Sequence, residues 1–308
     1  MRKAGPEPDP PRGVPLQARE LSLDLPHLRL AARAWGDAAL PPMLMLHGWL
    51  DNAASFDALA PLLCPHFHIV ALDLPGHGRS QHRPPGAWYH FIDYLDDMLA
   101  VVDALHWPRF HLLGHSLGAG IASVLAAACP QRIETLLLIE LIGPNTMPNE
   151  KSLAQLQRAL KQRKELQDKP LRVFEQPEQA IRARAQAGAI SDRAAGILVT
   201  RGLKSVPGGW SWSSDPRLMP AVPQRYGEEQ IVAILRGIRA PTQLILAEPM
   251  VLPIPEATIL ARAREVAGLE LVRMPGNHHL HLEDAEPVAR EILRCTRKHA
   301  SRADPAQA

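Results

Sequence analysis

The stretch that decides the fold runs from Phe110 to Ala128 and reads FHLLGHSLGAGIASVLAAA. It begins with a short apolar run typical of a buried strand, and its end, Gly118–Ala128, is small, apolar and helix-forming. Between them lies GHSLG (residues 114–118), a G-x-S-x-G pattern. In such a strand–turn–helix unit the serine occupies a sharp, strained turn, and the glycines let strand and helix pass closely. We therefore expect the Ser116 hydroxyl at the C-terminal edge of a sheet.

Short apolar runs and helical segments alternate along the rest of the chain. Residues 21–35 alternate apolar and polar positions, as expected of an antiparallel opening hairpin. The runs that predict buried strands are Met43–Leu46, Phe67–Leu72, Ile133–Ile139, Thr242–Leu246 and Leu269–Met274, and helical spacing occurs in Ser55–Leu63, Asp93–Leu105 and Glu286–Cys295. This alternation predicts an α/β fold with a mostly parallel central sheet and helices on both faces.

The alternation breaks in residues 148–239, where the composition is helical and no buried strand run occurs. We expect this segment to be a helical cap inserted over the sheet edge, with a Trp/Gly-rich patch at Gly208–Trp212. The predicted core consists of residues 16–147 and 240–298. Residues 1–15, rich in proline and charge, and residues 299–308 are predicted to be disordered tails.

The composition excludes several classes of protein. The chain has 308 residues, of which 46% are hydrophobic, and its formal net charge is +2 without a basic block, which argues against a nucleic-acid partner. Its apolar runs are too short for a membrane span. The cysteines Cys64, Cys129 and Cys295 form no disulfide pattern, and no apolar secretory signal opens the chain, so we expect a cytoplasmic protein.

The chain holds fourteen histidines, so the choice of a catalytic base depends on position. The segment PGNHHLHLE (residues 275–283) follows the last expected strand and precedes the last expected helix. A serine nucleophile on a G-x-S-x-G turn takes its base from a loop at that place, after the nucleophile in chain order. His278 lies nearest the strand end and is the preferred base, with His279 and His281 as alternatives.

An early loop offers a place for developing negative charge. His47-Gly48-Trp49 ends the expected strand at residues 43–46. A loop there can direct one backbone N–H at an oxyanion, and the residue after the nucleophile can direct a second. We expect the two donors to be the N–H groups of Trp49 and Leu117, whatever their side chains are.

Four motifs together resemble the α/β-hydrolase superfamily: HGWLDNAASF (47–56), ALDLPGHGRS (71–80), GHSLGAG (114–120) and PGNHHLHLEDAEPV (275–288). The opening LDLPHLRLAARAWG (23–36), followed by HGWLDNAASFD, is similar to the serine hydrolase-like (Kraken-type) subgroup. The resemblance runs from about residue 21 to 290 and is weakest in the insertion. It implies a serine nucleophile, a helical cap over the active site and no cofactor.

The chain departs from that pattern at the acid that orients the base. Many relatives carry an Asp shortly after the strand at residues 242–247, and this chain has Met250 there. Glu140 directly follows the apolar run 133–139, and the resembling subgroup carries its acid at that strand end. A carboxylate in this position is unusual unless it is paired, and an imidazole is a natural partner. Glu140 is the preferred acid, Glu248 is the alternative, and a site without an acid stays open.

These residues predict acyl transfer to water, with Ser116, His278 and Glu140 as a triad that cleaves a small or medium carboxylic ester. No carboxylate or cysteine stands at a metal spacing that spares the triad, and no P-loop or dinucleotide fingerprint occurs, so we expect a small-molecule substrate without metal or cofactor. The alternatives are C–C bond hydrolysis or perhydrolysis by the same residues, and a non-catalytic ligand-binding protein with a vestigial serine.

Overall fold

The computed structural model describes residues 17–167, 172–251 and 254–303. Eight strands form one sheet in the order β1-β2-β4-β3-β5-β6-β9-β10. Their bounds are β1 (Arg19–Asp24), β2 (Arg29–Trp35), β3 (Pro42–Leu46), β4 (His68–Leu72), β5 (Phe110–His115), β6 (Ile133–Ile139), β9 (Thr242–Glu248) and β10 (Glu270–Pro275). β2 pairs antiparallel with β1 and β4, and the strands from β4 to β10 in this order pair in parallel, so the predicted opening hairpin and parallel sheet are confirmed.

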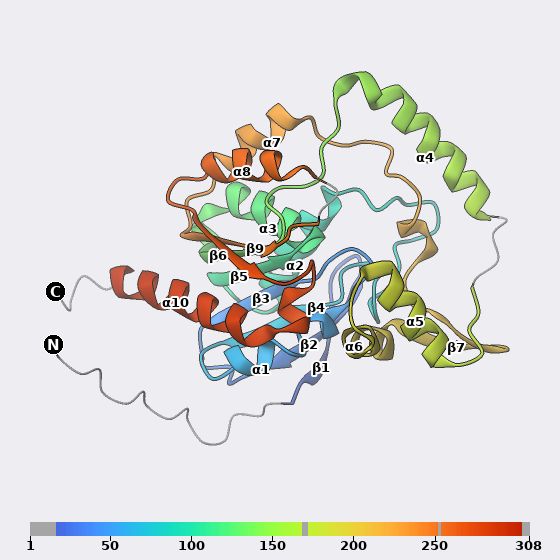
Figure 1. The fold of residues 1–308 in the computed structure, drawn as a ribbon, viewed down its shortest axis with the longest axis horizontal. Helices are drawn as coiled ribbons and strands as arrows, with labels where there is room; N and C mark the ends of the chain where they lie inside the picture. Colours follow the sequence, from blue (N-terminus) through green and yellow to red (C-terminus); the bar gives the residue numbers. More distant parts are fainter. Residues whose placement is uncertain (1–16, 168–171, 252–253, 304–308) are drawn as a thin grey trace.

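Helices cover both faces of the sheet (Figure 1). Successive strand residues face opposite sides, so Leu44 and Leu46 join one core cluster and Met43 and Met45 the other. The first cluster includes residues of α2 (Asp93–Ala104), α3 (Leu117–Ala128), α7 (Glu228–Leu235) and α8 (Glu256–Arg264), and the second includes residues of α1 (Ala60–Leu63) and α10 (Ala285–Ala303). The short α9 (Leu280–Glu283) and the 3-10 turns η1 (Ala53–Phe56), η2 (Pro130–Arg132), η3 (Asn149–Lys151) and η4 (Pro216–Leu218) complete the connections.

The insertion contains α4 (Ser152–Gln167), α5 (Pro177–Gly188) and α6 (Asp192–Gly202), which lie on the right of the molecule in Figure 1, with α4 apart from α5 and α6. It also contains an antiparallel hairpin, β7 (Leu203–Val206) and β8 (Gly209–Trp212), which the expectation of a helical cap did not include. The turn between the strands holds Gly208 and Gly209 at φ values of +86° and +142°, which favour glycine. Most of the Trp/Gly-rich patch therefore lies in strand β8.

Two further expectations differ from the structure in extent. The segment predicted as one helix at Ser55–Leu63 is divided into η1 and α1, and Pro61 stands in the first turn of α1. α10 continues to Ala303, past residue 299, where the C-terminal tail was expected to begin. The predicted N-terminal tail lies outside the described residues. In the part of the chain that the structure describes, no helix is long and apolar enough to cross a membrane.

Candidate active site

Ser116 lies between β5 and α3 in a strained backbone conformation, with φ 50° and ψ −113°. A Cβ at Gly114 would lie 2.4 Å from the carbonyl oxygen of Gly118, and a Cβ at Gly118 would lie 2.0 Å from that of Leu46. Both glycines are thus required by the close passage of strand and helix. The Ser116 N–H donates to the carbonyl of Ile139 on β6, which holds the turn against the neighbouring strand. This is the geometry of a serine held out at a strand end.

The His278 ring contacts a buried carboxylate. Its Nδ1 lies 3.0 Å from Glu140 Oε2, although the two residues are 138 positions apart in the sequence. Glu140 has no exposed surface and directly follows β6, with φ 68°. The end of the strand therefore sets the direction of its side chain. The Ala247 N–H donates to the other carboxylate oxygen, Oε1. The structure thus pairs His278 with the preferred carboxylate, and a quarter of the imidazole side chain stays exposed.

His115 connects the serine turn with the histidine loop. Its Nε2 donates to the carbonyl of His278 at 2.8 Å, and the two rings are 4.8 Å apart. Because His115 precedes Ser116, this bond places the serine turn beside the loop that carries His278. Within the described residues, Ser116 Oγ and the His278 ring form no hydrogen bond, and such contacts are often loose without a substrate.

The alternative carboxylate lies elsewhere. Glu248 is the last residue of β9 and is exposed, and its carbonyl accepts from the Gly276 N–H at 3.4 Å. No contact joins its side chain to His278 in the described residues. Met250, at the place where relatives carry an Asp, packs against the larger core cluster.

The two expected oxyanion donors come from two different segments, the loop after β3 and the first residue of α3. Leu117 is the first residue of α3, so its N–H has no acceptor within the helix. The Gly118 N–H donates to the carbonyl of His47, which joins the loop after β3 to the serine turn. Trp49 follows in that loop, and its indole Nε1 donates to the carbonyl of Leu218 at 3.2 Å, so its side chain contacts the insertion.

Comparison with known proteins agrees with this architecture. Residues 41–189 match the family described as alpha/beta hydrolase fold. The serine hydrolase-like protein of Danio rerio is 31% identical over 290 residues, which cover 89% of this chain and 87% of that protein. The chain belongs to the α/β-hydrolase fold family.

Solved α/β structures align over most of this hydrolase-family chain. The hypothetical protein PA1622 of Pseudomonas aeruginosa is 42% identical, with a TM-score of 0.84 over 92% of this chain and 99% of that one. A thioesterase domain from the curacin biosynthetic pathway is 27% identical, with a TM-score of 0.77 over 90% and 99%. At 92% coverage, the alignment with PA1622 includes most of residues 148–239 as well as the sheet.

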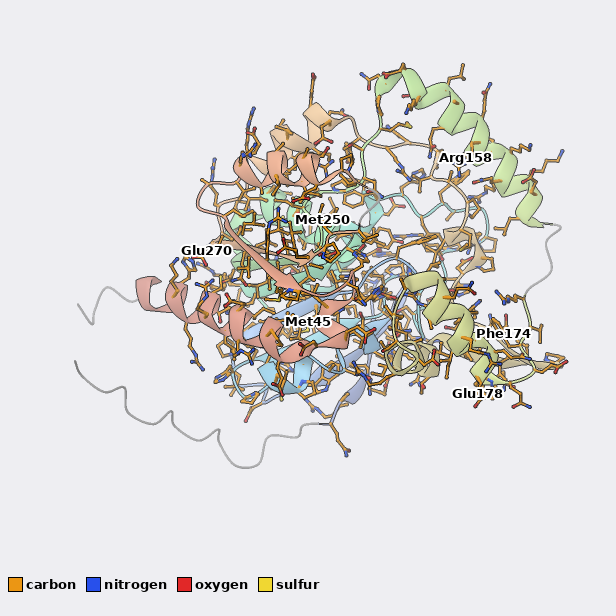
Figure 2. The ribbon with its side chains drawn as sticks, viewed as in Figure 1. Met45, Arg158, Phe174, Glu178, Met250 and Glu270 are labelled. Carbon is orange, nitrogen blue, oxygen red and sulfur yellow. The ribbon has the colours of Figure 1, made fainter. Side chains whose placement is uncertain are left out.

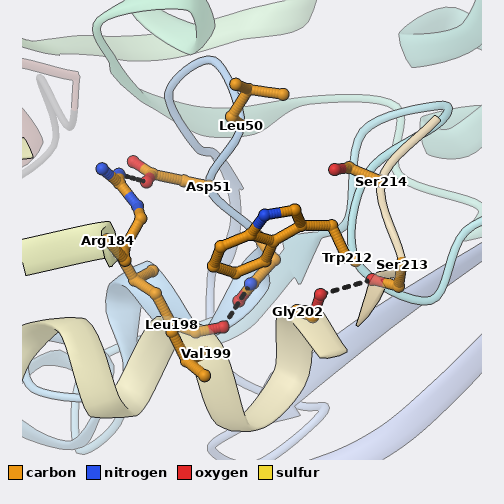
Figure 3. A pocket seen from close by; sticks show the side chains of 11 residues that line it. Leu50, Asp51, Arg184, Leu198, Val199, Gly202, Trp212, Ser213 and Ser214 are labelled. Carbon is orange, nitrogen blue, oxygen red and sulfur yellow. Dashed lines mark hydrogen bonds and ion pairs between the residues drawn. The ribbon is translucent and has the colours of Figure 1, made fainter. Parts of the chain in front are cut away.

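A second buried group lies beside His278 in this α/β-hydrolase. One ligand atom each from Asp51, His115 and His279 lies within 4.8 Å of the others, a spacing that three ligands of one metal ion can share. Its members come from three separate segments, the loop after β3, the end of β5 and the residue before α9, so no spacing in the sequence marks this group. Arg184 of α5 donates to Asp51 (Figure 3), and its Nη2 lies 3.4 Å from His279 Nε2. The guanidinium thus already neutralises the carboxylate.

The insertion is held to the core at this group. Arg184 and Asp51 line a cavity of about 20 Å³ between the loop after β3 and the insertion, which has room for about one water molecule. A second arginine of the insertion, Arg201, is 4% exposed and donates through Nε to both carboxylate oxygens of Asp73. The insertion is therefore bound to the core through two arginine–carboxylate pairs whose carboxylates, Asp51 and Asp73, are buried.

Several histidines around the site are held in the neutral form. Burial, and next the neighbouring histidines, keep the pKa of His115 well below its usual value. Burial likewise lowers the pKa of His281 to about 3 and that of His77 to about 3. Burial raises the pKa of Asp51, but His279 and Arg184 outweigh it and hold that pKa well below normal. The site therefore buries several groups that would bind protons in the unfolded chain.

We expect acid to destabilise the folded state. An unfolded histidine has a pKa of about 6.5, whereas the folded His77 and His281 have pKa values of about 3. Between about pH 6.5 and pH 3 the unfolded chain therefore binds more protons than the native one. The stability that the folded state owes to keeping these histidines neutral is fully present above about pH 6.5 and is lost as the pH falls below it. His77 and His281 should each lower the free energy of unfolding by about 2 kcal/mol between pH 7 and pH 5.

Urea unfolding across that range measures how steeply the free energy of unfolding depends on pH. His281→Gln should make this dependence shallower, and an unchanged slope would show that His281 is not kept neutral.

Proposed function

We propose that this chain is a serine hydrolase that cleaves a small or medium carboxylic ester through an acyl-enzyme. Ser116 attacks the carbonyl carbon while Nε2 of His278 accepts its proton, because Nδ1 is already engaged by Glu140. The N–H groups of Trp49 and Leu117 stabilise the oxyanion, the alcohol leaves with the proton from His278, and water then releases the acid in the reverse sequence.

The observation that carries this proposal is the contact between His278 and the buried Glu140. A buried carboxylate on the outer ring nitrogen fixes the tautomer in which the other nitrogen is a proton acceptor, and it stabilises the imidazolium that forms. A vestigial serine in a ligand-binding protein would not need that arrangement. The same residues also suit C–C bond hydrolysis or perhydrolysis, which a substrate screen distinguishes from ester hydrolysis.

We also propose the domain division expected from the sequence, with residues 148–239 as a cap and residues 16–147 and 240–298 as the core. The hydrogen bond from Trp49 Nε1 to Leu218 O supports a cap that contacts the oxyanion loop. α7 lies within the proposed cap range but packs against the core, through Ile231 and Leu235. The substrate-shaping part of the cap is therefore α4 to η4.

Replacing the acid tests the triad. In Glu140→Gln the new amide oxygen accepts from the Ala247 N–H, so its NH₂ group points at His278 Nδ1. That donor forces the imidazole proton onto Nε2, which then cannot accept from Ser116. We expect kcat on p-nitrophenyl esters of graded chain length to fall by about a thousandfold or more.

Glu248→Gln is the matched control, because it makes the same change on an exposed carboxylate at the neighbouring strand end. It should leave kcat within about twofold, as expected of an exposed residue remote from the chemistry. If both variants keep wild-type activity, Glu140 is not the acid. If no ester is hydrolysed and a fluorophosphonate probe does not label the wild-type protein, the chain is not a serine hydrolase.

A further inference from the structure

A second cavity lies away from the proposed triad, between the beginning of α4 and the chain that leads into it. Its volume is about 340 Å³, which lies within the range of small-molecule sites. Its lining includes Lys151, Arg158 and Arg225 but neither Asp nor Glu. Figure 2 shows Arg158 on α4. The cavity thus gathers three cations without an acidic residue.

These cations have no carboxylate partner in the part of the chain that the structure describes. Arg225 is exposed, and partial desolvation together with repulsion from Arg158 lowers the pKa of its guanidinium. Like charges that line one cavity repel each other, and a bound anion removes that repulsion. The arrangement is therefore more favourable with an anion than without one.

A neighbouring network that contains Glu228 contacts the wall of the cavity at Thr146. Arg262 is fully buried and donates to the carbonyls of Ile142 and Pro144. Its Nε and Nη2 pair with Glu228, whose Oε2 also accepts from the hydroxyl of Thr146 in the cavity wall. Glu228 is thus already neutralised by Arg262 and does not compensate the three cavity cations.

We propose that this cavity binds the phosphoryl group of a small molecule. A phosphomonoester carries a charge of about −1.5 to −2 at neutral pH and three acceptor oxygens, which matches three cationic donors better than a carboxylate does. Thr146 and Glu140 are joined by a short stretch of chain, so the cavity and the proposed acid are at most about 21 Å apart. The proposal does not depend on the catalytic role of Ser116.

Calorimetric titration of the full-length protein with inorganic phosphate tests the site. The ionic strength of all solutions is kept equal by adding chloride salt. Each cation removed should weaken binding by about tenfold, so Arg158→Gln should lose about tenfold and the Arg158→Gln/Arg225→Gln variant about a hundredfold. The matched control is Lys161→Gln/Lys164→Gln, which removes two exposed cations from the same helix and should bind phosphate as the wild type does.

Four results would overturn the proposal: no saturable phosphate binding, equal binding by the wild type and the double variant, equal loss in the lysine control, or succinate binding as tightly as phosphate. Arg158 is exposed, so its single variant gives a result even if the double variant does not fold. Phosphate should also raise the Tm of the wild type and leave that of the double variant unchanged, because a ligand stabilises only the state that binds it.

Discussion

Ser116→Ala should abolish covalent labelling by a fluorophosphonate probe and lower ester turnover by about three orders of magnitude or more. Ser116 carries the proposed nucleophile on a backbone with φ 50°, and alanine has the same Cβ as serine, so the turn keeps its geometry and only the hydroxyl is lost. Labelling is read by intact-protein mass spectrometry, and turnover is measured on p-nitrophenyl esters.

Ser214→Ala is a matched control, because Ser214 lines the small cavity next to Asp51 but lies outside the serine turn. It should be labelled and active as the wild type is. The free energy of unfolding of Ser116→Ala should also stay close to that of the wild type. Retained ester turnover in purified, folded Ser116→Ala would show that another group is the nucleophile.

His278→Ala should reduce kcat to a similar extent, by about a thousandfold or more, because no other group then accepts the serine proton. Removing the imidazole also leaves the buried Glu140 without its 3.0 Å partner, so this variant is expected to lose stability as well. His278→Gln separates the two effects, since its amide can donate to Glu140 but cannot act as a general base. Both variants should therefore be inactive, and the second should be the more stable.

The neighbouring histidines give the comparison for that experiment. His281 Nε2 bonds Ser55 Oγ at 2.8 Å, and His279 Nε2 lies 3.2 Å from Asp51 Oδ2, so both have structural partners. His279→Ala and His281→Ala should cost stability, about 1–3 kcal/mol for a buried group left unpaired, and much less kcat than His278→Ala. If His281→Ala were the least active at equal stability, the base would have been placed on the wrong histidine.

Local pattern was enough for most of the fold. The GHSLG turn, the apolar strand runs and the opening hairpin follow from residues close together in the chain, and the structure contains each of them. The β7–β8 hairpin escaped prediction because its strands are short and only partly buried, so they lack the apolar run that identified the others. The division of Ser55–Leu63 escaped because periodicity does not show where a helix is interrupted.

The sequence by itself determined which residues are the candidates for the chemistry, because the strand–serine–helix pattern and the order of proposed nucleophile, acid and base are properties of the chain. Only the tertiary structure decided which carboxylate meets His278: Glu140 ends the strand beside β5, whereas Glu248 is exposed one strand further out. The same holds for Arg184, which reaches Asp51 from 133 positions away. Such pairs depend on strand order and on the fold of the cap, which place distant residues together without leaving a spacing in the sequence.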